Sequence, residues 1–135
     1  MSYDIYLRFE KCDRCQYRQE SPELPNPTYN LTPIFDLALT GEPLPNSSVS
    51  EAGVVLLGEK TDRPRGLRIL SGRKAADTTV AIRKALGHLG DPSKRAEFMA
   101  LEPSNGWGTM DDAEYVFRKL LTAAEEYPEG VWDIG

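Results

Sequence analysis

The sequence is poor in the residues that build disulfide frameworks and most catalytic or metal centres. It has two cysteines and one histidine among 135 residues. Two cysteines three positions apart do not make a secreted disulfide framework. No apolar run approaches the roughly 18 residues of a membrane span, and the first residues lack the basic and apolar regions of a secretory signal. We therefore expect a protein of the cytosol that has no membrane segment.

Positive charge is also scarce. Sixteen lysines and arginines stand against 21 acidic residues, so the net charge is −5. Broad nucleic-acid binding requires a cationic face, and this balance argues against it. A hydrophobic fraction of 40% is ordinary for a soluble globular protein. The length suits one globular domain over residues 1–135.

Both ends of the chain are expected to form strands. In residues 3–9 every second side chain is apolar, which is typical of a half-buried strand: Tyr3, Ile5, Leu7 and Phe9 share one face. Residues 12–15 would turn the chain, and residues 16–20 would return it as a hairpin. Residues 131–134 predict a final strand. Tyr6 and Trp132 are expected to be exposed aromatic residues on these strands.

Helices are expected between the terminal strands. Thr32 and Pro33 open a short helix that Gly41 closes, and Ser93 caps a second short helix that runs to Leu101. A longer helix over residues 71–89 carries an apolar stripe made of Ala75, Thr79, Ile82, Leu86 and Leu89. His88 lies off this stripe and is expected to face solvent.

The second long helix has the clearest pattern. Thr109 and Asp112 form a capping-box-like pair at its start. Its apolar stripe follows helical spacing and consists of Ala113, Val116, Phe117, Leu120, Leu121 and Ala124. Residues 40–53 are rich in loop-forming residues and predict a flexible loop. The predicted fold class is therefore α+β, with a small, mostly antiparallel sheet of the terminal strands packed against two long amphipathic helices and short helices.

Cys12 and Cys15 are the candidate metal ligands. Two thiolates at this spacing in a turn can point at one zinc ion, but a closed zinc site takes four nitrogen or sulfur ligands. Apart from the two cysteines, the only other nitrogen or sulfur ligand of this kind in the sequence is His88. A complete site therefore needs ligands from carboxylates, from a second copy of the chain or from a partner protein. We favour two reduced thiols and no cofactor, with zinc at Cys12 and Cys15 as the alternative.

Catalytic residue sets are poorly represented. A nucleophile–histidine–acid arrangement has to use His88, on the expected outer face of a helix. The acidic residues Asp111, Asp112 and Glu114 stand at a helix start, where the helix dipole already favours them. The sequence contains neither a phosphate-binding P-loop pattern nor a dinucleotide-binding fingerprint. We predict that the protein is not an enzyme.

A basic segment over residues 59–74 stands out from the acidic remainder. Six cations against two carboxylates give it a charge of +4, which leaves −9 on the rest of the chain. Arg73 and Lys74 fall in the first turn of the predicted 71–89 helix, where the dipole disfavours cations. Free backbone N–H groups and cations together can bind an anion there. The alternative is that these cations pair with acidic groups elsewhere in the protein.

Asn105, Gly106, Trp107 and Gly108 form a glycine-hinged loop before the last helix. Two glycines around a tryptophan permit positive φ or a close approach to another surface. Trp107 can roof a pocket, anchor a partner or fill the core. We favour burial of its ring with the indole N–H bonded to a backbone carbonyl, although the residue types alone do not decide between function and structure.

Three motifs carry a resemblance to a known family. They are TYNxTPxF from Thr28, GLRxLxGRK from Gly66 and EPxNGWG from Glu102, together with the opening residues 2–7. With these motifs the chain resembles a family of small bacteriophage and prophage proteins, often from actinobacterial hosts. The resemblance implies a phage setting and the host cytosol but no reaction. The candidate binding residues at matching positions are Tyr29, Asn30, Arg68, Gly72, Asn105, Gly106 and Trp107. Arg73 and Lys74 of the basic segment complete the set of candidates.

Three functions remain open at this point. The preferred hypothesis is a non-enzymatic binding protein that occludes or sequesters a host component, including components of antiviral defence. The second is a binder of nucleotides or other anionic small molecules through the basic segment and Trp107. The third is a phage structural or assembly protein that forms a homo-oligomer by pairing the exposed edges of its terminal strands.

Overall fold

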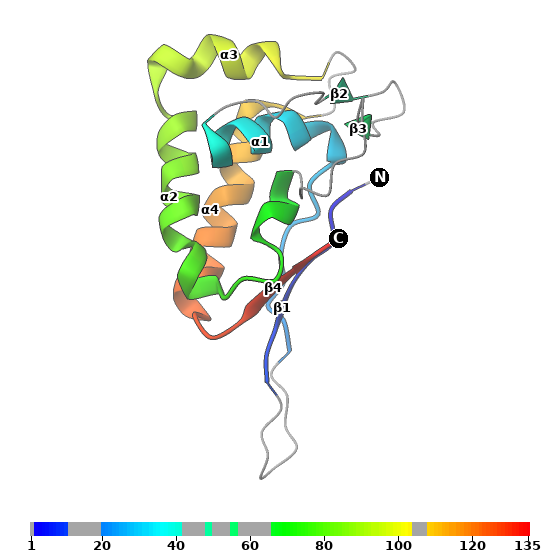
Figure 1. Ribbon diagram of the computed structural model, residues 1–135, viewed down its shortest axis with the longest axis vertical. Helices are drawn as coiled ribbons and strands as arrows, with labels where there is room; N and C mark the ends of the chain where they lie inside the picture. The colour runs from blue at the N-terminus through cyan, green and yellow to red at the C-terminus, as the bar shows by residue number, and fades with distance from the viewer. Residues whose placement is uncertain (1, 11–19, 42–47, 50–54, 57–65, 104–107) are drawn as a thin grey trace.

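The computed structural model describes residues 2–10, 20–41, 48–49, 55–56, 66–103 and 108–135. The elements follow the chain in the order β1 (Ile5–Arg8), η1 (Tyr29–Leu31), α1 (Thr32–Thr40), β2 (Ser48–Val49), β3 (Val55–Leu56), η2 (Gly66–Leu70), α2 (Ala75–Leu89), η3 (Pro92–Lys94), α3 (Arg95–Ala100), α4 (Met110–Glu126) and β4 (Val131–Ile134), where η marks a 3-10 helix. Helices predominate and gather on one side of the β1–β4 pair (Figure 1). The predicted α+β class is confirmed.

The chain termini meet in one antiparallel pair of strands, β1 and β4. Ile5 lies opposite Ile134, and Leu7 lies opposite Trp132. The alternation of β1 buries Tyr3, Ile5 and Leu7 against the helices, as the sequence predicted. The prediction that Trp132 is exposed is wrong, since its side chain is only 1% exposed. Trp132 faces the helical layer, whereas Tyr6 on the outer face is 52% exposed.

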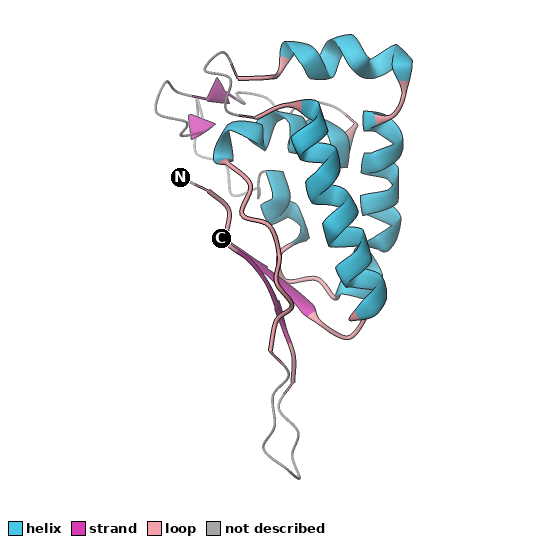
Figure 2. Cartoon of the chain, turned by 180° about the vertical axis from the view of Figure 1, so that it is seen from behind, coloured by secondary structure: helices cyan, strands magenta, loops and turns pink. Residues whose placement is uncertain are grey.

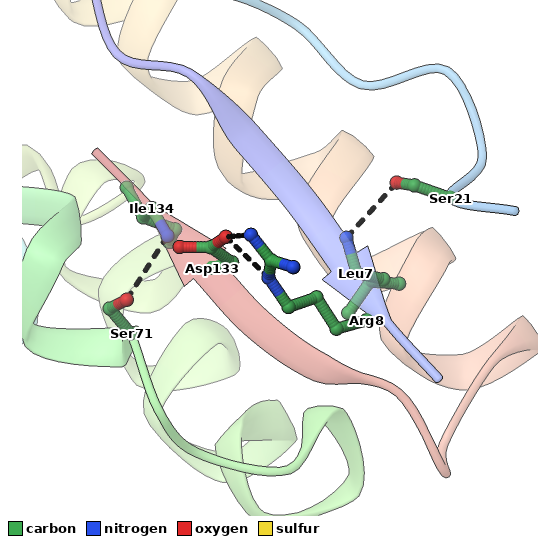
Figure 3. Close-up of polar contacts among 6 residues, drawn as sticks. All are labelled: Leu7, Arg8, Ser21, Ser71, Asp133 and Ile134. Atoms are coloured by element: carbon green, nitrogen blue, oxygen red, sulfur yellow. Dashed lines mark hydrogen bonds and ion pairs between the residues drawn. The ribbon is translucent and has the colours of Figure 1, made fainter. Parts of the chain in front are cut away.

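Other parts of the chain border both outer edges of the β1–β4 pair: the segment before η1 along β1, and the turn of residues 71–74 along β4 (Figures 2 and 3). Along β1, the N–H of Tyr3 donates to Pro27 O at 2.8 Å and that of Leu7 donates to Ser21 Oγ at 3.0 Å. Along β4, the N–H of Ile134 donates to Ser71 Oγ at 3.0 Å, and residues 72 and 73 exchange backbone hydrogen bonds with residue 132. The hypothesis of an edge-pairing oligomer depended on an exposed Trp132 and on open strand edges. The structure buries Trp132 and places other parts of the chain along both edges.

Helices α2 and α4 pack side by side (Figure 1), and the indole N–H of Trp132 in β4 donates to Thr78 of α2. At the start of α4, Thr109 and Asp112 form the predicted capping box. The predicted stripe is buried apart from Leu121, which is half-buried, and Met110 and Ala123 join it. Glu114 and Arg118, four positions apart, form an ion pair on the solvent side of this helix. Local pattern alone therefore specified this helix almost completely.

Helix α2 ends at Leu89 as predicted, but its start and its buried face differ from the prediction. It begins at Ala75 rather than residue 71, because residues 71–74 are drawn into pairing with β4. Its buried positions are Ala75, Thr78, Ile82, Ala85 and Leu89, so the predicted Thr79 and Leu86 are only half-buried. His88 does not face solvent freely: it is half-buried, and its Nδ1 lies 3.1 Å from Ala38 O at the end of α1. Contact with α1 rotates the buried face of α2.

The short helices are capped differently from expectation. Helix α1 ends at Gly41 with φ +79°, as predicted, but its start is continuous with η1, and Thr32 Oγ1 donates to Tyr29 O instead of capping. Asp91, not Ser93, caps the turn before α3. Within the predicted 40–53 loop, the described residues Ser48–Val49 pair with Val55–Leu56. Residues 16–19 of the predicted returning strand lie outside the described residues, and Glu20 has no strand conformation.

Candidate functional site

The first two motifs meet at an aromatic–arginine cluster, which we define as Tyr3, Tyr29 and Arg68. The rings of Tyr3 and Tyr29 form an edge-to-face pair with centroids 4.6 Å apart. The Arg68 guanidinium carbon lies 5.3 Å from the Tyr29 centroid and 5.8 Å from the Tyr3 centroid. Arg68 Nη2 also donates to Tyr29 Oη at 3.2 Å. The structure thus brings together two of the predicted site residues, Tyr29 and Arg68.

A buried polar network supports this cluster from below. Thr32 Oγ1 donates to Tyr29 O at 2.7 Å, so the hydroxyl of Tyr3 is left to donate to Thr32 Oγ1 at 2.5 Å. The fully buried carboxylate of Asp36 accepts the N–H of Gly66. These bonds link residues 29–36 to residue 66, so the first two motifs pack on each other. This packing explains the spacing of the residues within each motif.

The hydroxyl of Tyr3 provides a pH test of this network. Burial raises the pKa of Tyr3 to about 12 from its ordinary value of 10.0. Between these two values the unfolded chain loses the proton while the folded protein retains it. Stability from this group is therefore complete below pH 10 and lost as pH rises through 12. Between pH 10 and 12 the unfolding free energy, measured with denaturant, is expected to fall by about 2–3 kcal/mol more in the original protein than in Tyr3→Phe. Equal losses in the two proteins would contradict the assignment of this pH dependence to Tyr3.

The other predicted cations do not join this cluster. Lys74 Nζ pairs with Glu129 at 3.4 Å, and Arg73 lies beside β4 through its backbone bonds to Leu70 and Trp132. Gly72, with φ +83°, makes the exposed turn between them and Arg68. No hydrogen bond or ion pair within the described chain connects Arg73 or Lys74 to Arg68 or Tyr29.

The anion site expected at the start of the 71–89 helix lacks its donors. Arg73 and Lys74 precede the first helical turn of α2, and Lys74 holds the N-cap position with extended backbone. The N–H groups of Ala75 and Ala76 donate to Gly130 O and Pro128 O at 2.7 and 3.1 Å. These backbone donors are used by the turn before β4, so they are not available to a ligand.

Asn30 is a buried residue rather than part of an open surface. Its side chain is 3% exposed, and its backbone N–H donates to Thr28 Oγ1 at 3.3 Å. Its Oδ1 accepts no hydrogen bond within the described part of the chain. The position therefore contributes to the core beneath η1 and is closed to a ligand from solvent.

The remaining predicted site residues cannot be placed. Asn105, Gly106 and Trp107 lie outside the described residues, as do Cys12 and Cys15. Among the residues described, no three histidine, cysteine, aspartate or glutamate side chains are grouped as metal ligands would be. Within the same residues, no helix has the length and apolarity of a membrane span.

Gly108, the last residue of the third motif, shows why this position requires glycine. Its φ is +123°, and a Cβ there would stand 2.7 Å from Leu31 Cδ2. Both the backbone conformation and the contact with Leu31 exclude a side chain. The entry to α4 is thereby held against η1, so Gly108 lies beside the first motif.

A groove lies where these segments meet. It has a volume of about 360 Å³ and runs between the extended segment before η1 and the first turns of α4. Its lining residues are Pro25, Asn26, Pro27, Thr28, Leu31, Gly108, Asp112, Tyr115 and Val116. Tyr115 is 56% exposed, and Lys119 Nζ lies 5.5 Å from its ring centroid.

Sequence reasoning missed this groove, although one signal pointed to it. Tyr115 is an aromatic residue off the apolar stripe of α4, so its exposure followed from helical spacing. The opposite wall gave no such signal, because prolines at 25 and 27 indicate extended chain without showing what they pack against.

Comparison with known proteins adds no assignment. No protein-family model, curated protein or solved structure matches the chain. The resemblance to phage proteins therefore stays a prediction, and the function has to be argued from the groove and the aromatic–arginine cluster.

Proposed function

We propose that the chain is a non-enzymatic binding protein of phage type that acts in the host cytosol by occluding a host protein, including one of antiviral defence. The observation that carries this proposal is the groove with the exposed ring of Tyr115 at its side. Exposed tyrosines beside apolar concavities commonly anchor protein interfaces. The half-buried Pro25 and the ring of Tyr115 supply the apolar surface that such a partner would cover, and the buried Leu31 and Val116 lie behind it.

The walls of the groove favour recognition by side chains over strand addition. Pro25 and Pro27 have no N–H to donate, and Pro27 O already accepts from Tyr3. An added strand would therefore find few free backbone groups on this wall. Apolar side chains of the partner can instead enter between the prolines and Tyr115.

Asp112 gives the groove a fixed negative charge. Its carboxylate accepts the N–H of Thr109 at 2.9 Å in the capping box, which holds it in place at the groove. A basic side chain next to the apolar anchors of the partner would match this charge. The expected partner segment thus combines an apolar anchor with a lysine or arginine.

The test is capture of a host partner with a matched pair of variants. Tagged protein is used to capture a partner from an actinobacterial host lysate, and the partner is then purified for calorimetry. Tyr115→Ala is expected to weaken binding by about 2 kcal/mol, the loss typical of an anchoring aromatic residue. The melting temperature should move by only a few degrees, because this side chain is largely exposed.

Tyr6→Ala is the control, since it removes a similarly exposed tyrosine from the outer face of the sheet. It is expected to keep full affinity for the purified partner. Equal binding by the Tyr115→Ala protein, or equal loss with Tyr6→Ala, would refute the groove as the docking site.

A further inference from the structure

Arg68 differs from three other described arginines in the groups that contact its guanidinium. Arg8, Arg83 and Arg118 each pair with a carboxylate, of Asp133, Glu125 and Glu114 respectively. Arg68 forms no ion pair within the described chain, and its guanidinium rests instead on the rings of Tyr3 and Tyr29. The rings hold this charge in one place, and no carboxylate of the described residues pairs with it.

Stacking prepares this guanidinium to bind. The ring of Tyr3 is buried, and its hydroxyl is fixed on Thr32, so the platform beneath Arg68 is rigid. Arg68 is itself exposed, and among the described residues only one of its donors is used, on Tyr29 Oη. An arginine ordered on aromatic faces loses less side-chain freedom when it forms further hydrogen bonds.

Tyr29 adds a second donor at the same place. Its Oη accepts a hydrogen bond from Arg68 Nη2, so its own O–H hydrogen points elsewhere. No acceptor for that hydrogen is found among the residues that the structure describes. The cluster thus presents the free N–H groups of a fixed cation and one neutral hydroxyl donor.

We propose that Arg68 and Tyr29 form an anion site that takes a phosphate monoester. A guanidinium can bind two phosphate oxygens side by side, and the third oxygen can accept from the hydroxyl of Tyr29. A carboxylate has only two oxygens and one negative charge, so it fits this set of donors less well. The site is separate from the groove at Tyr115, which shares no lining residue with it.

The test follows the Arg68 Nε–Hε signal by NMR during titration with inorganic phosphate, adenosine monophosphate and acetate at constant ionic strength. Phosphate and the nucleotide are expected to give saturable shifts, and acetate is expected to give none. Tighter binding of the nucleotide would assign the monoester to a nucleotide, whereas equal affinities would assign it to the phosphate group alone. A shift that grows linearly without saturation, or an equal response to acetate, would overturn the proposal.

Three variants separate this site from general charge attraction. Arg68→Lys keeps the charge but loses the planar fork, and affinity is expected to fall at least about tenfold. Tyr29→Phe keeps the stacking ring but removes the hydroxyl, with an expected loss of about threefold to tenfold. Arg83→Lys alters an ion-paired arginine elsewhere and should leave affinity unchanged. Equal effects of Arg68→Lys and Arg83→Lys would refute the site.

Discussion

Trp132→Ala is expected to cost about 3–5 kcal/mol of unfolding free energy, the usual range when a large buried aromatic residue is truncated. Trp132 is 1% exposed and stands at the junction of β4 with the helical layer. Its Nε1 donates to Thr78 Oγ1 at 2.8 Å, and that hydroxyl in turn donates to Ala75 O. The substitution leaves a cavity and removes one partner from a buried hydrogen-bonded chain. Denaturant unfolding followed by circular dichroism measures the loss.

Trp132→Phe separates the two contributions. It keeps most of the ring volume but removes the indole N–H, so a smaller cost of about 1–3 kcal/mol is expected. A melting temperature of the Trp132→Ala protein within a few degrees of the original would contradict the burial of this side chain between sheet and helices.

Gly66→Ala is expected to destabilise the protein by about 2–5 kcal/mol through two additive effects. The backbone at Gly66 has φ +57°, which side-chain-bearing residues rarely adopt. A Cβ there would also collide with the hydroxyl of Tyr3 and stand 3.0 Å from Thr32 Cγ2. Both neighbours belong to the buried network under the aromatic–arginine cluster, so neither can move away without losing a hydrogen bond.

Gly72→Ala serves as the matched control for this prediction. Gly72 has φ +83°, but a Cβ at this position would meet nothing within 4 Å. It should therefore carry only the conformational cost, about 1–2 kcal/mol. Thermal unfolding of both variants compares them directly, and equal losses would show that contact with Tyr3 and Thr32 contributes nothing at Gly66.

The elements that could be predicted from the sequence are those whose signals are local. Helix α4 has its capping box and its apolar spacing within one continuous segment, so its start and its buried face followed from residues that are neighbours in the chain. The alternation of β1 and the left-handed Gly41 at the end of α1 are equally local. In each case the pattern needed no knowledge of what packs against it.

The errors occurred where another segment changed the outcome. Residues 71–74 had helical character in the sequence but pair with β4, so α2 starts later and the anion site expected at its start has no free donors. His88 was assigned to solvent, yet the end of α1 covers it. The pattern predicts an exposed Trp132, because a short terminal strand does not show which of its faces meets the helices, and the fold buries it.

For the candidate sites, the sequence selected residue types but not their grouping. Tyr29 and Arg68 were chosen as separate motif positions, and only the fold places the guanidinium on the two tyrosine rings. Asn30 was chosen in the same way, and the fold buries it. A polar residue in a motif can serve either packing or binding, and only its exposure in the folded protein distinguishes the two roles.

The sequence by itself determined the α+β class, the start and buried face of α4 and the strand character of both termini, because periodicity and capping act between residues close along the chain. Tertiary structure alone decided that the two termini pair, that both edges of this pair are covered, and that the groove forms beside Tyr115. These features depend on contacts between segments far apart in the chain. Their free energy comes from burial and hydrogen bonds across the fold, which no local pattern records.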